Sequence, residues 1–364
     1  MAAECLFYPP FRKSVIKINR LTFKRRRTLL VIALLIALSW MALSGDRQHR
    51  PNNDQVISSH SIPLDPRNPS RTELGKLRFL GAWVLESEND RFGGISSLEA
   101  LPDGRFVALG DGATLIDFRI APGGAIVDPF IRPLPWRGNQ KEEPEYEERD
   151  SESIVRVPET GEYWISFENR SSLRRYSPDL SRELETIRPK AMKRWPSNGG
   201  GEALARLVDG RFILIAEYGE AKGGGYEGLI WPGQPSAKVE PQRFAYLPPE
   251  GFHATDAKVL PDGRLLVLNR RLAFPTGLSA ALTVIDGDAI RPGARVRGTL
   301  LAKLESPLAV DNMEALAVTQ EGGQNIVWIA SDDNFNAFQR TLLMKFALPK
   351  EPSATTGPGF DSLN

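Results

Sequence analysis

An internal repeat constrains the fold of this 364-residue chain more than any other feature of its sequence. Five copies of one unit lie within residues 72–349, and each consists of a small or acidic opening residue, a short apolar strand, a glycine turn and a second apolar strand. The copies begin 50 to 58 residues apart, which fits a four-stranded propeller blade and is too long for leucine-rich or ankyrin units. The opening residues are Ser96, Glu152, Glu202, Asp256 and Glu314.

The repeat predicts an all-β fold, a β-propeller of five four-stranded blades. A sixth blade in a stretch where the repeat has diverged is an open alternative. The 32 Gly and 28 Pro interrupt the chain too often for long helices and favour short strands joined by turns. Two packed sandwiches are the alternative, but they would not repeat one acid-to-glycine spacing five times. The glycines expected to turn the hairpins are Gly104, Gly161, Gly210, Gly263 and Gly322 or Gly323.

The two ends of the repeat region complement each other. The last copy runs out after residues 341–348, one strand short of a full blade, whereas the apolar segment 77–85 stands alone before the first copy. We expect segment 77–85 to complete the last blade, so that strands from both ends of the domain close the ring and remove its free edges.

The N-terminal residues carry a targeting pattern. Residues 1–27 contain eight Lys or Arg and one Glu, and residues 28–44 are almost entirely apolar. A basic region followed by an apolar one is typical of a secretory signal or a signal anchor. We expect 1–27 to stay in the cytoplasm and 28–44 to be a cleaved signal or an uncleaved anchor helix. The following domain would then be periplasmic or extracytoplasmic, tethered to the inner membrane or secreted after cleavage.

Charge and cysteine content exclude several classes for the body of the protein. Beyond residue 27 there are 38 basic and 44 acidic residues, a net charge of about −6, so nucleic acid is a poor partner. The single cysteine allows neither an internal disulfide nor a cysteine-based zinc site. Residues 45–71 are polar and rich in Pro, Asn and Ser, which predicts a tether, and 350–364 are expected to be a disordered tail. The expected domain, 72–349, is a monomer.

The predicted topology gathers polar residues on one rim of the ring. Strands one and two of a blade are antiparallel, so the start of the first and the end of the second lie on the same face. The opening residues therefore share this rim with the residues that end the second strands, namely Asp111, Glu168, Asn169, Arg170, Glu217, Asn269, Arg270, Arg271, Asp332, Asp333 and Asn334. Carboxylate and amide oxygens suit Ca²⁺, and arginines suit a phosphate or carboxylate. In a second interpretation, the acids accept N–H bonds from the neighbouring blade and lock the ring together.

His253 is the one histidine within the expected domain, because His49 and His60 precede it. It lies three residues before Asp256 on the predicted rim, where a general base could act. The sequence contains no G-x-S-x-G nucleophile elbow, and its glycine runs lack the Lys-Ser/Thr that follows a phosphate-binding loop.

Four groups of short motifs carry a family resemblance. They are D-S-E-S-I from Asp150, S-F-E-N-R from Ser166 with L-R-R-Y from Leu173, G-G-E-A-L from Gly200, and N-M-E-A-L from Asn312 with S-D-D-N from Ser331. In this order they resemble the exported bacterial family called esterase-like activity of phytase, over roughly residues 75–348. The resemblance implies a phytase-like propeller outside the cytoplasmic membrane that hydrolyses phosphate or other esters.

The calcium-dependent propeller phytases supply a mechanistic analogy, in which Ca²⁺ ions in a carboxylate-lined mouth polarise the phosphate and activate water. This sequence departs from that pattern at Ser96, which is not acidic, and at Arg270 and Arg271, where a metal-only site would have acids.

Three functions stay open from the sequence. The first is a hydrolase of a small-molecule ester or phosphoester. Its catalytic candidates are Glu152, Glu168, His253 and Asp256, its ligands for Ca²⁺ or another divalent cation are Glu152, Glu202, Asp256 and Glu314, and its substrate-binding candidates are Arg170, Arg270 and Arg271. The second is a non-enzymatic propeller that presents a binding face in the cell envelope, since fold does not fix function. The third, a lactonase-type propeller with one central divalent ion, needs four converging oxygen ligands.

Overall fold

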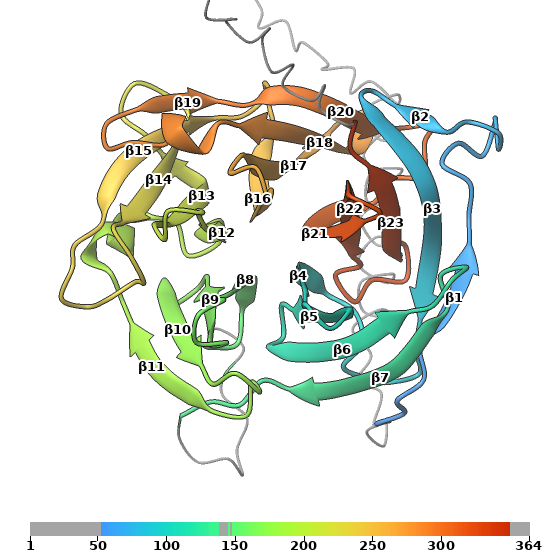
Figure 1. Cartoon of the computed structure of the whole chain (residues 1–364), viewed down its shortest axis with the longest axis horizontal. Helices are drawn as coiled ribbons and strands as arrows, with labels where there is room; N and C mark the ends of the chain where they lie inside the picture. The colour runs from blue at the N-terminus through green and yellow to red at the C-terminus, as the bar shows by residue number, and fades with distance from the viewer. Residues whose placement is uncertain (1–51, 138–144, 146–147, 350–364) are drawn as a thin grey trace, which may run out of the picture. The chain divides into compact units, whose positions relative to one another are not determined.

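The computed structural model of the chain describes residues 52–137, 145 and 148–349. These residues form five sheets arranged as a ring, with one strand of each sheet innermost (Figure 1). The predicted all-β propeller of five blades is confirmed, and the described part of the chain contains no sixth blade. Its other regular elements are two short 3₁₀ helices, η2 (Lys190–Arg194) and η3 (Gly287–Ala289).

The first two blades are simple four-stranded meanders. Blade one contains β4 (Ile95–Ala100), β5 (Arg105–Gly110), β6 (Thr114–Ile120) and β7 (Ile126–Pro133). Blade two contains β8 (Ser151–Arg156), β9 (Tyr163–Phe167), β10 (Ser172–Tyr176) and β11 (Glu183–Ile187). In both blades the order along the chain is the order in space, from the ring axis outward.

Blades three and four share one segment of chain. Blade three contains β12 (Gly201–Arg206), β13 (Phe212–Glu220), β14 (Tyr226–Trp231) and β15 (Gln242–Leu247). Blade four contains β16 (His253–Val259), β17 (Leu265–Ala273), β18 (Gly277–Ile285) and β20 (Thr299–Glu305). Between β18 and β20 the chain crosses to blade three, where β19 (Arg295–Arg297) pairs in parallel with β15. This crossover links the outer edges of the two blades.

Blade five joins the two ends of the domain. It contains β21 (Asn312–Glu321), β22 (Gln324–Asp332) and β23 (Thr341–Ala347), followed by β3 (Leu77–Glu86), β1 (Ser58–Ser61) and the short β2 (Glu73–Leu74). β3 runs antiparallel to β23, with Trp83 opposite Leu343. The predicted closure of the ring by segment 77–85 is confirmed.

The chain before residue 72 belongs in part to the propeller, which corrects the prediction of a polar tether over residues 45–71. β1 pairs with β3, and Ile57 and Leu64 are buried in the cores on the two sides of blade five. The polar composition concealed this strand, because three of its four residues are exposed at the edge of the blade.

The predicted cytoplasmic segment, signal or anchor segment and tail, residues 1–27, 28–44 and 350–364, lie outside the described residues. Within the described part of the chain, no helix is long and apolar enough to cross a membrane.

The hydrophobic core is divided into five clusters, one between each pair of neighbouring blades. The cluster between blades two and three, for example, includes Trp164 from one blade and Trp231 from the other. Because each sheet packs on both faces, the innermost strands are held between two neighbours, and the side chains at their ends are fixed in position.

Turn glycines set the hairpins that bring the start of each first strand and the end of each second strand to one rim. All the predicted turn glycines have a positive φ, among them Gly210 at +88° and Gly263 at +89°. Glycine adopts this left-handed conformation without the steric cost that a Cβ brings. The predicted hairpins are confirmed.

Candidate functional site

Each innermost strand carries a β-bulge near its start, at the end of the ring axis that we call the mouth. The pairing register with the second strand shifts once in every blade, which identifies the bulged residue. The bulged residues are Ser96, Glu152, Glu202, Thr255 and Glu314. Blade four therefore aligns through Thr255, and the choice of Asp256 as its opening residue is wrong by one position. Because side chains alternate along a strand, that position faces a different way.

The bulged side chains are of two chemical kinds. Ser96 and Thr255 donate hydrogen bonds to the next blade, Ser96 to the carbonyl oxygen of Ser151 at 2.7 Å and Thr255 to that of Met313 at 3.3 Å. The other three blades carry the longer acids Glu152, Glu202 and Glu314. The ring thus places three carboxylates at one level of the mouth.

Neighbouring carboxylates complete two groups, each of three residues whose ligand atoms lie within 4.8 Å of one another. One group is Asp150, Glu152 and Glu168, and the other is Glu168, Glu202 and Glu217, so Glu168 belongs to both. We call these five buried residues the mouth carboxylates. Hard oxygen ligands at this spacing suit a divalent cation such as Ca²⁺. Of the four predicted metal ligands, Glu152 and Glu202 are in these groups, whereas Asp256 and Glu314 are not.

The mouth carboxylates differ in how far the protein satisfies them. Glu168 accepts hydrogen bonds from the backbone N–H groups of Gly199 and Gly200, the second at 2.9 Å. Glu152 and Glu202 are each only 7% exposed, and their side chains form no hydrogen bond with any residue that the structure describes. A buried charge without a partner is costly, so the two glutamates require a proton or a cation.

The electrostatics of the mouth agree with this requirement. Burial raises the pKa of Glu152 well above its usual value, and the charges of Glu168 and Asp150 raise it further. Burial, together with the charges of Glu152 and Glu217, has the same effect on the pKa of Glu202. Desolvation and like charges both favour the neutral acid, and a bound cation would reverse that preference.

Three more acids border the mouth. Burial raises the pKa of Glu314 to about 8 against the opposing effect of Arg270. Burial and the charges of Asp332 and Asp150 raise the pKa of Asp111 to about 7, and burial raises that of Asp332 to about 6. The Oδ1 atom of Asp111 is buried and has no hydrogen-bond partner among the described residues. The cluster of buried acidic groups therefore extends beyond the five mouth carboxylates.

Arg270 is the predicted anion-binding residue that the structure brings to the mouth. Its Nη2 donates to Glu217 at 2.6 Å, and its Nη1 donates to Glu314 at 2.6 Å and to the side chain of Asn312 at 2.7 Å. Burial alone would lower the pKa of Arg270, but the charges of Glu314 and Glu217 raise it. Arg270 therefore places a positive charge between Glu217 and Glu314.

The structure does not bring the other two predicted arginines to the same place. Arg271 follows Arg270 on β17, so its side chain lies on the opposite face, 4.8 Å from the ring centre of Phe252. Arg170 is exposed and forms a 3.9 Å ion pair with Glu148.

Asp256 is fully buried and saturated with hydrogen bonds. Its Oδ2 accepts from the hydroxyl of Ser97 and from the N–H of Leu316, both at 2.9 Å. Its Oδ1 accepts from the hydroxyl of Ser153 at 3.2 Å and from the N–H of Ala257 at 2.8 Å. Asp256 realises the second interpretation, in which an acid accepts N–H bonds from the neighbouring blade.

The two serines and a lysine extend this network around the ring axis. Ser97 accepts the N–H of Ile154 at 3.3 Å, and Ser153 accepts the N–H of Leu204 at 3.2 Å. The Nζ of Lys258 lies 3.3 Å from Asp256 and donates to the carbonyl oxygen of Ile154 at 2.9 Å. The innermost strands of all five blades are joined through these contacts. We call Asp256, Ser97, Ser153 and Lys258 the Asp256 hub.

His253 lies at the start of β16, between two tyrosines. The centres of its ring and those of Tyr218 and Tyr226 are 4.5 and 5.0 Å apart. Its Nδ1 is 3.3 Å from the carbonyl oxygen of Glu217. If Nδ1 carries the proton, Nε2 is left as the basic nitrogen.

Asp150 and Glu217 were not among the predicted metal ligands, and Lys258 and Glu99 were not among the predicted site residues. Asp150 precedes Glu152 by two residues, and this spacing could have suggested that the two side chains lie on the same face of the strand. Lys258 stands two residues after Asp256 and lies 3.6 Å from Glu99, whose pKa burial raises to about 7. Only the closure of the ring brings Glu99 and Lys258 together.

The fold and this site define a five-bladed β-propeller with an acidic mouth. A phytase-like family model, described as esterase-like activity of phytase, matches residues 90–335, and the chain belongs to this family. A search of curated proteins found none that matches the chain.

Several solved structures are similar to the chain at low identity and low TM-score. An exo-1,5-alpha-L-arabinanase from a bovine ruminal metagenomic library is 14% identical, with a TM-score of 0.44 over 73% of this chain and 97% of that one. The glutaminyl cyclase of Myxococcus xanthus is 11% identical, with a TM-score of 0.44 over 76% of this chain and 100% of that one. The major Malassezia sympodialis allergen Mala s 1 is 11% identical, with a TM-score of 0.42 over 80% and 94%. At these values the likeness says nothing about activity.

Proposed function

We propose that this protein is an exported, metal-assisted hydrolase of phosphate or other small-molecule esters, and that its site is the mouth. The observation that carries the proposal is the pair of buried glutamates without hydrogen-bond partners, Glu152 and Glu202, which meet Glu168 from two sides. A divalent cation fits this all-carboxylate donor set, and Ca²⁺ is the first candidate because it accepts many oxygen ligands in flexible geometry.

The carboxylates of the mouth are the proposed cation ligands, and backbone groups orient one of them. Asp150, Glu152 and Glu168, or Glu168, Glu202 and Glu217, would hold the cation, and a bound cation would polarise the ester and lower the pKa of water. The N–H groups of Gly199 and Gly200 orient Glu168, so that its carboxylate serves both halves of the site.

Arg270 and His253 act beside the cation. Arg270, held by Glu217 and Glu314, binds the anionic part of the substrate, so Glu314 acts as a positioning residue and not as a ligand. Nε2 of His253 accepts a proton from the attacking water.

Calcium titration with and without substrate tests the proposal. The full-length protein is stripped with EDTA, titrated with calcium by calorimetry, and assayed with p-nitrophenyl phosphate and p-nitrophenyl acetate. We expect calcium binding and calcium-dependent hydrolysis of at least one ester, both lost in the double variant Glu152→Gln, Glu202→Gln and kept in the exposed control Glu88→Gln. Calcium binding without hydrolysis would favour a binding propeller of the envelope, and the absence of both would reject the metal site.

Export is part of the proposal and has its own test. The basic residues 1–27 oppose translocation, and the apolar residues 28–44 can engage the secretion machinery. A reporter fused after Gly45 should be active only if it works outside the cytoplasm. A reporter active only in the cytoplasm would reject the assignment.

A further inference from the structure

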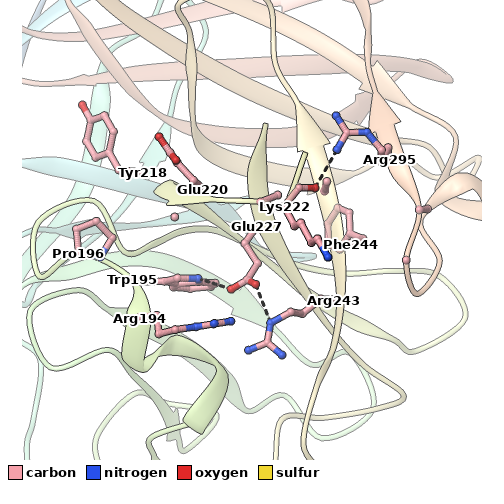
Figure 2. A pocket seen from close by; sticks show the side chains of 15 residues that line it. Arg194, Trp195, Pro196, Tyr218, Glu220, Lys222, Glu227, Arg243, Phe244 and Arg295 are labelled. Atoms are coloured by element: carbon pink, nitrogen blue, oxygen red, sulfur yellow. Dashed lines mark hydrogen bonds and ion pairs between the residues drawn. The ribbon is translucent and has the colours of Figure 1, made fainter. Parts of the chain in front are cut away.

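A cavity of about 910 Å³ lies on the flank of blade three (Figure 2). It is bounded by the loop that enters blade three from blade two, by the end of β13, and by parts of β15 and β19. Its volume falls within the range of pockets that bind small molecules. None of the mouth carboxylates lines this cavity.

Positive charge dominates the wall of this flank cavity. Four basic side chains line it, against the two acids Glu220 and Glu227; the basic residues are Arg194, Lys222, Arg243 and Arg295. Two other cavities, of about 750 and 720 Å³, have no such excess, because one is lined by a single arginine with two glutamates and the other by one lysine with one glutamate. A smaller cavity of about 210 Å³ is also mainly basic, with Arg156, Arg206 and Lys258 against Glu99, but its volume is below the range of small-molecule pockets. Among the three large cavities the basic excess belongs to the flank cavity, and it contrasts with the acidic mouth of the same blade.

A buried carboxylate orients one of the arginines in advance. Glu227 accepts a hydrogen bond from Nε1 of Trp195 at 2.8 Å and another from Nε of Arg243 at 2.7 Å (Figure 2). The side chain of Arg243 is 43% exposed, and its Nη2 makes only a long 3.5 Å contact, with the carbonyl oxygen of Ala191. A guanidinium fixed through Nε presents its outer nitrogens as a fork that matches an oxyanion.

Further positive charge near this fork has no partner. The side chains of Arg194 and Lys222 form no hydrogen bond or ion pair with any described residue. In Figure 2 the guanidinium of Arg194 points toward that of Arg243. Two guanidinium groups directed into one region repel each other until an anion lies between them.

Aromatic side chains form another part of the cavity wall. Trp195 and Phe244 are buried side chains of its wall, and Trp195 is fixed by its bond to Glu227. Arg295 donates to the carbonyl oxygens of Lys222, Gly223 and Gly224, which holds the β13–β14 turn in place. An indole beside a guanidinium fork suits a ligand with a flat apolar part next to its charge.

We propose that the flank cavity is a second binding site, separate from the mouth, for a small molecule in which a phosphate or carboxylate is joined to a flat apolar group. The oxyanion binds the outer nitrogens of Arg243 together with Arg194 and Lys222. The apolar group lies against Trp195.

Calorimetry on the full-length protein in EDTA tests this site while the mouth holds no cation. Phenyl phosphate and benzoate are the ligands, and inorganic phosphate and phenol are the references. We expect the better of the two ligands to bind at least tenfold more tightly than either reference, and its identity decides between phosphate and carboxylate. Arg194→Ala and Lys222→Ala should each weaken binding about tenfold, the loss expected for one charge-assisted hydrogen bond.

Two matched variants make the result specific. Arg188→Ala removes an exposed positive charge that does not line the cavity, and Glu152→Gln with Glu202→Gln alters only the mouth. Both proteins should bind phenyl phosphate or benzoate as the wild type does. Equal affinity of the wild type and the Arg194→Ala, Lys222→Ala double variant would overturn the proposal, and so would loss of binding in either matched variant.

Discussion

The mouth carboxylates and the Asp256 hub lie next to each other on the innermost strands, but they differ in how many hydrogen bonds their buried carboxylates receive. Asp256 receives hydrogen bonds from three neighbouring strands and has Lys258 beside it. Glu152 and Glu202 are almost as deeply buried and receive no hydrogen bond from any described residue. The β-bulge causes the difference, because the bulged residue faces the mouth while the next residue faces the ring axis. Satisfaction of the carboxylate, and not its burial, separates the structural acid from the candidate ligands.

The largest expected effect comes from breaking the hub. Asp256→Ala should lower the free energy of unfolding by about 3–5 kcal/mol, because it breaks a fully buried ion pair and removes the closer of the two carboxylates beside Lys258. It also removes the acceptor of the Leu316 N–H and of two serine hydroxyls. Urea unfolding of the EDTA-treated protein measures this loss.

The loss at Asp256 should be the same with and without calcium, since the residue belongs to neither metal group. Asp103→Ala, which removes a half-exposed acid from a hairpin turn, is the control and should cost far less. An Asp256→Ala protein as stable as the wild type, or one that loses only its calcium response, would return Asp256 to the metal site.

The second effect concerns calcium. An ion that binds only the folded protein stabilises it by about 2.7 kcal/mol at a hundredfold excess over its dissociation constant. Glu152→Gln or Glu202→Gln should abolish this gain. Without metal, either variant should be at least as stable as the wild type, because the neutral amide removes repulsion among crowded carboxylates. Thermal unfolding in EDTA and in excess calcium measures both quantities.

Opposite signs in EDTA distinguish the mouth from the hub. If the glutamates were structural acceptors like Asp256, their amide variants would unfold more easily in EDTA and calcium alike. That result would erase the distinction between the two regions.

The repeat predicted the fold well because it follows from local rules. The spacing of opening residues and turn glycines predicted five hairpins, and the unpaired segments 77–85 and 341–348 predicted the closure of the ring. It did not predict β1, since an edge strand needs only one buried neighbour and can keep a polar composition. Nor did it predict the bulges, because a one-residue shift in pairing leaves the hydrophobic pattern of a short buried strand almost unchanged.

The sequence predicted the kinds of side chain in the candidate site correctly, but several of the particular positions were wrong. Glu152, Glu168 and Glu202 do meet, whereas Asp256 stands one position too late and two of the three arginines lie elsewhere. In a strand whose two faces are both buried, sequence alone does not tell which face a charged side chain takes. Contacts such as that between Lys258 and Glu99 link residues 159 positions apart and depend on the closed ring.

The third effect is a pH dependence of the metal-free protein. The pKa of Glu314 is raised from 4.5 to about 8 by burial, so between these values the folded protein binds more protons than the unfolded chain. The protonated Glu314 therefore makes its full contribution to the free energy of unfolding below pH 4.5. This contribution is lost as the pH rises through about 8, by up to about 1.4 kcal/mol per pH unit for one such group. Asp111 and Asp332, with pKa values raised to about 7 and about 6, act in the same direction.

Urea unfolding in EDTA at pH 5, 6, 7 and 8 tests this dependence. The unfolding midpoint should fall steadily across the series, and Glu314→Gln should make the fall shallower. Calcium should restore the stability at pH 8, because the bound ion replaces the protons. A metal-free protein that became more stable from pH 5 to pH 8 would contradict the raised pKa values of the buried acids at the mouth.

The smallest expected effect separates the two faces of a single strand. Arg271→Ala removes the contact with the Phe252 ring and should cost about 0.5–1 kcal/mol, the usual range for an exposed cation–π pair. It should leave calcium binding and ester hydrolysis unchanged, since Arg271 contacts no acid of the mouth. Arg270→Ala should instead reduce hydrolysis of p-nitrophenyl phosphate, because it removes the guanidinium, held by Glu217 and Glu314, that we propose binds the anionic part of the substrate. Arg271→Ala could instead impair hydrolysis as strongly as Arg270→Ala. In that case both arginines would belong to the substrate-binding site, as the sequence alone predicts, and the alternation of side chains along β17 would not separate them.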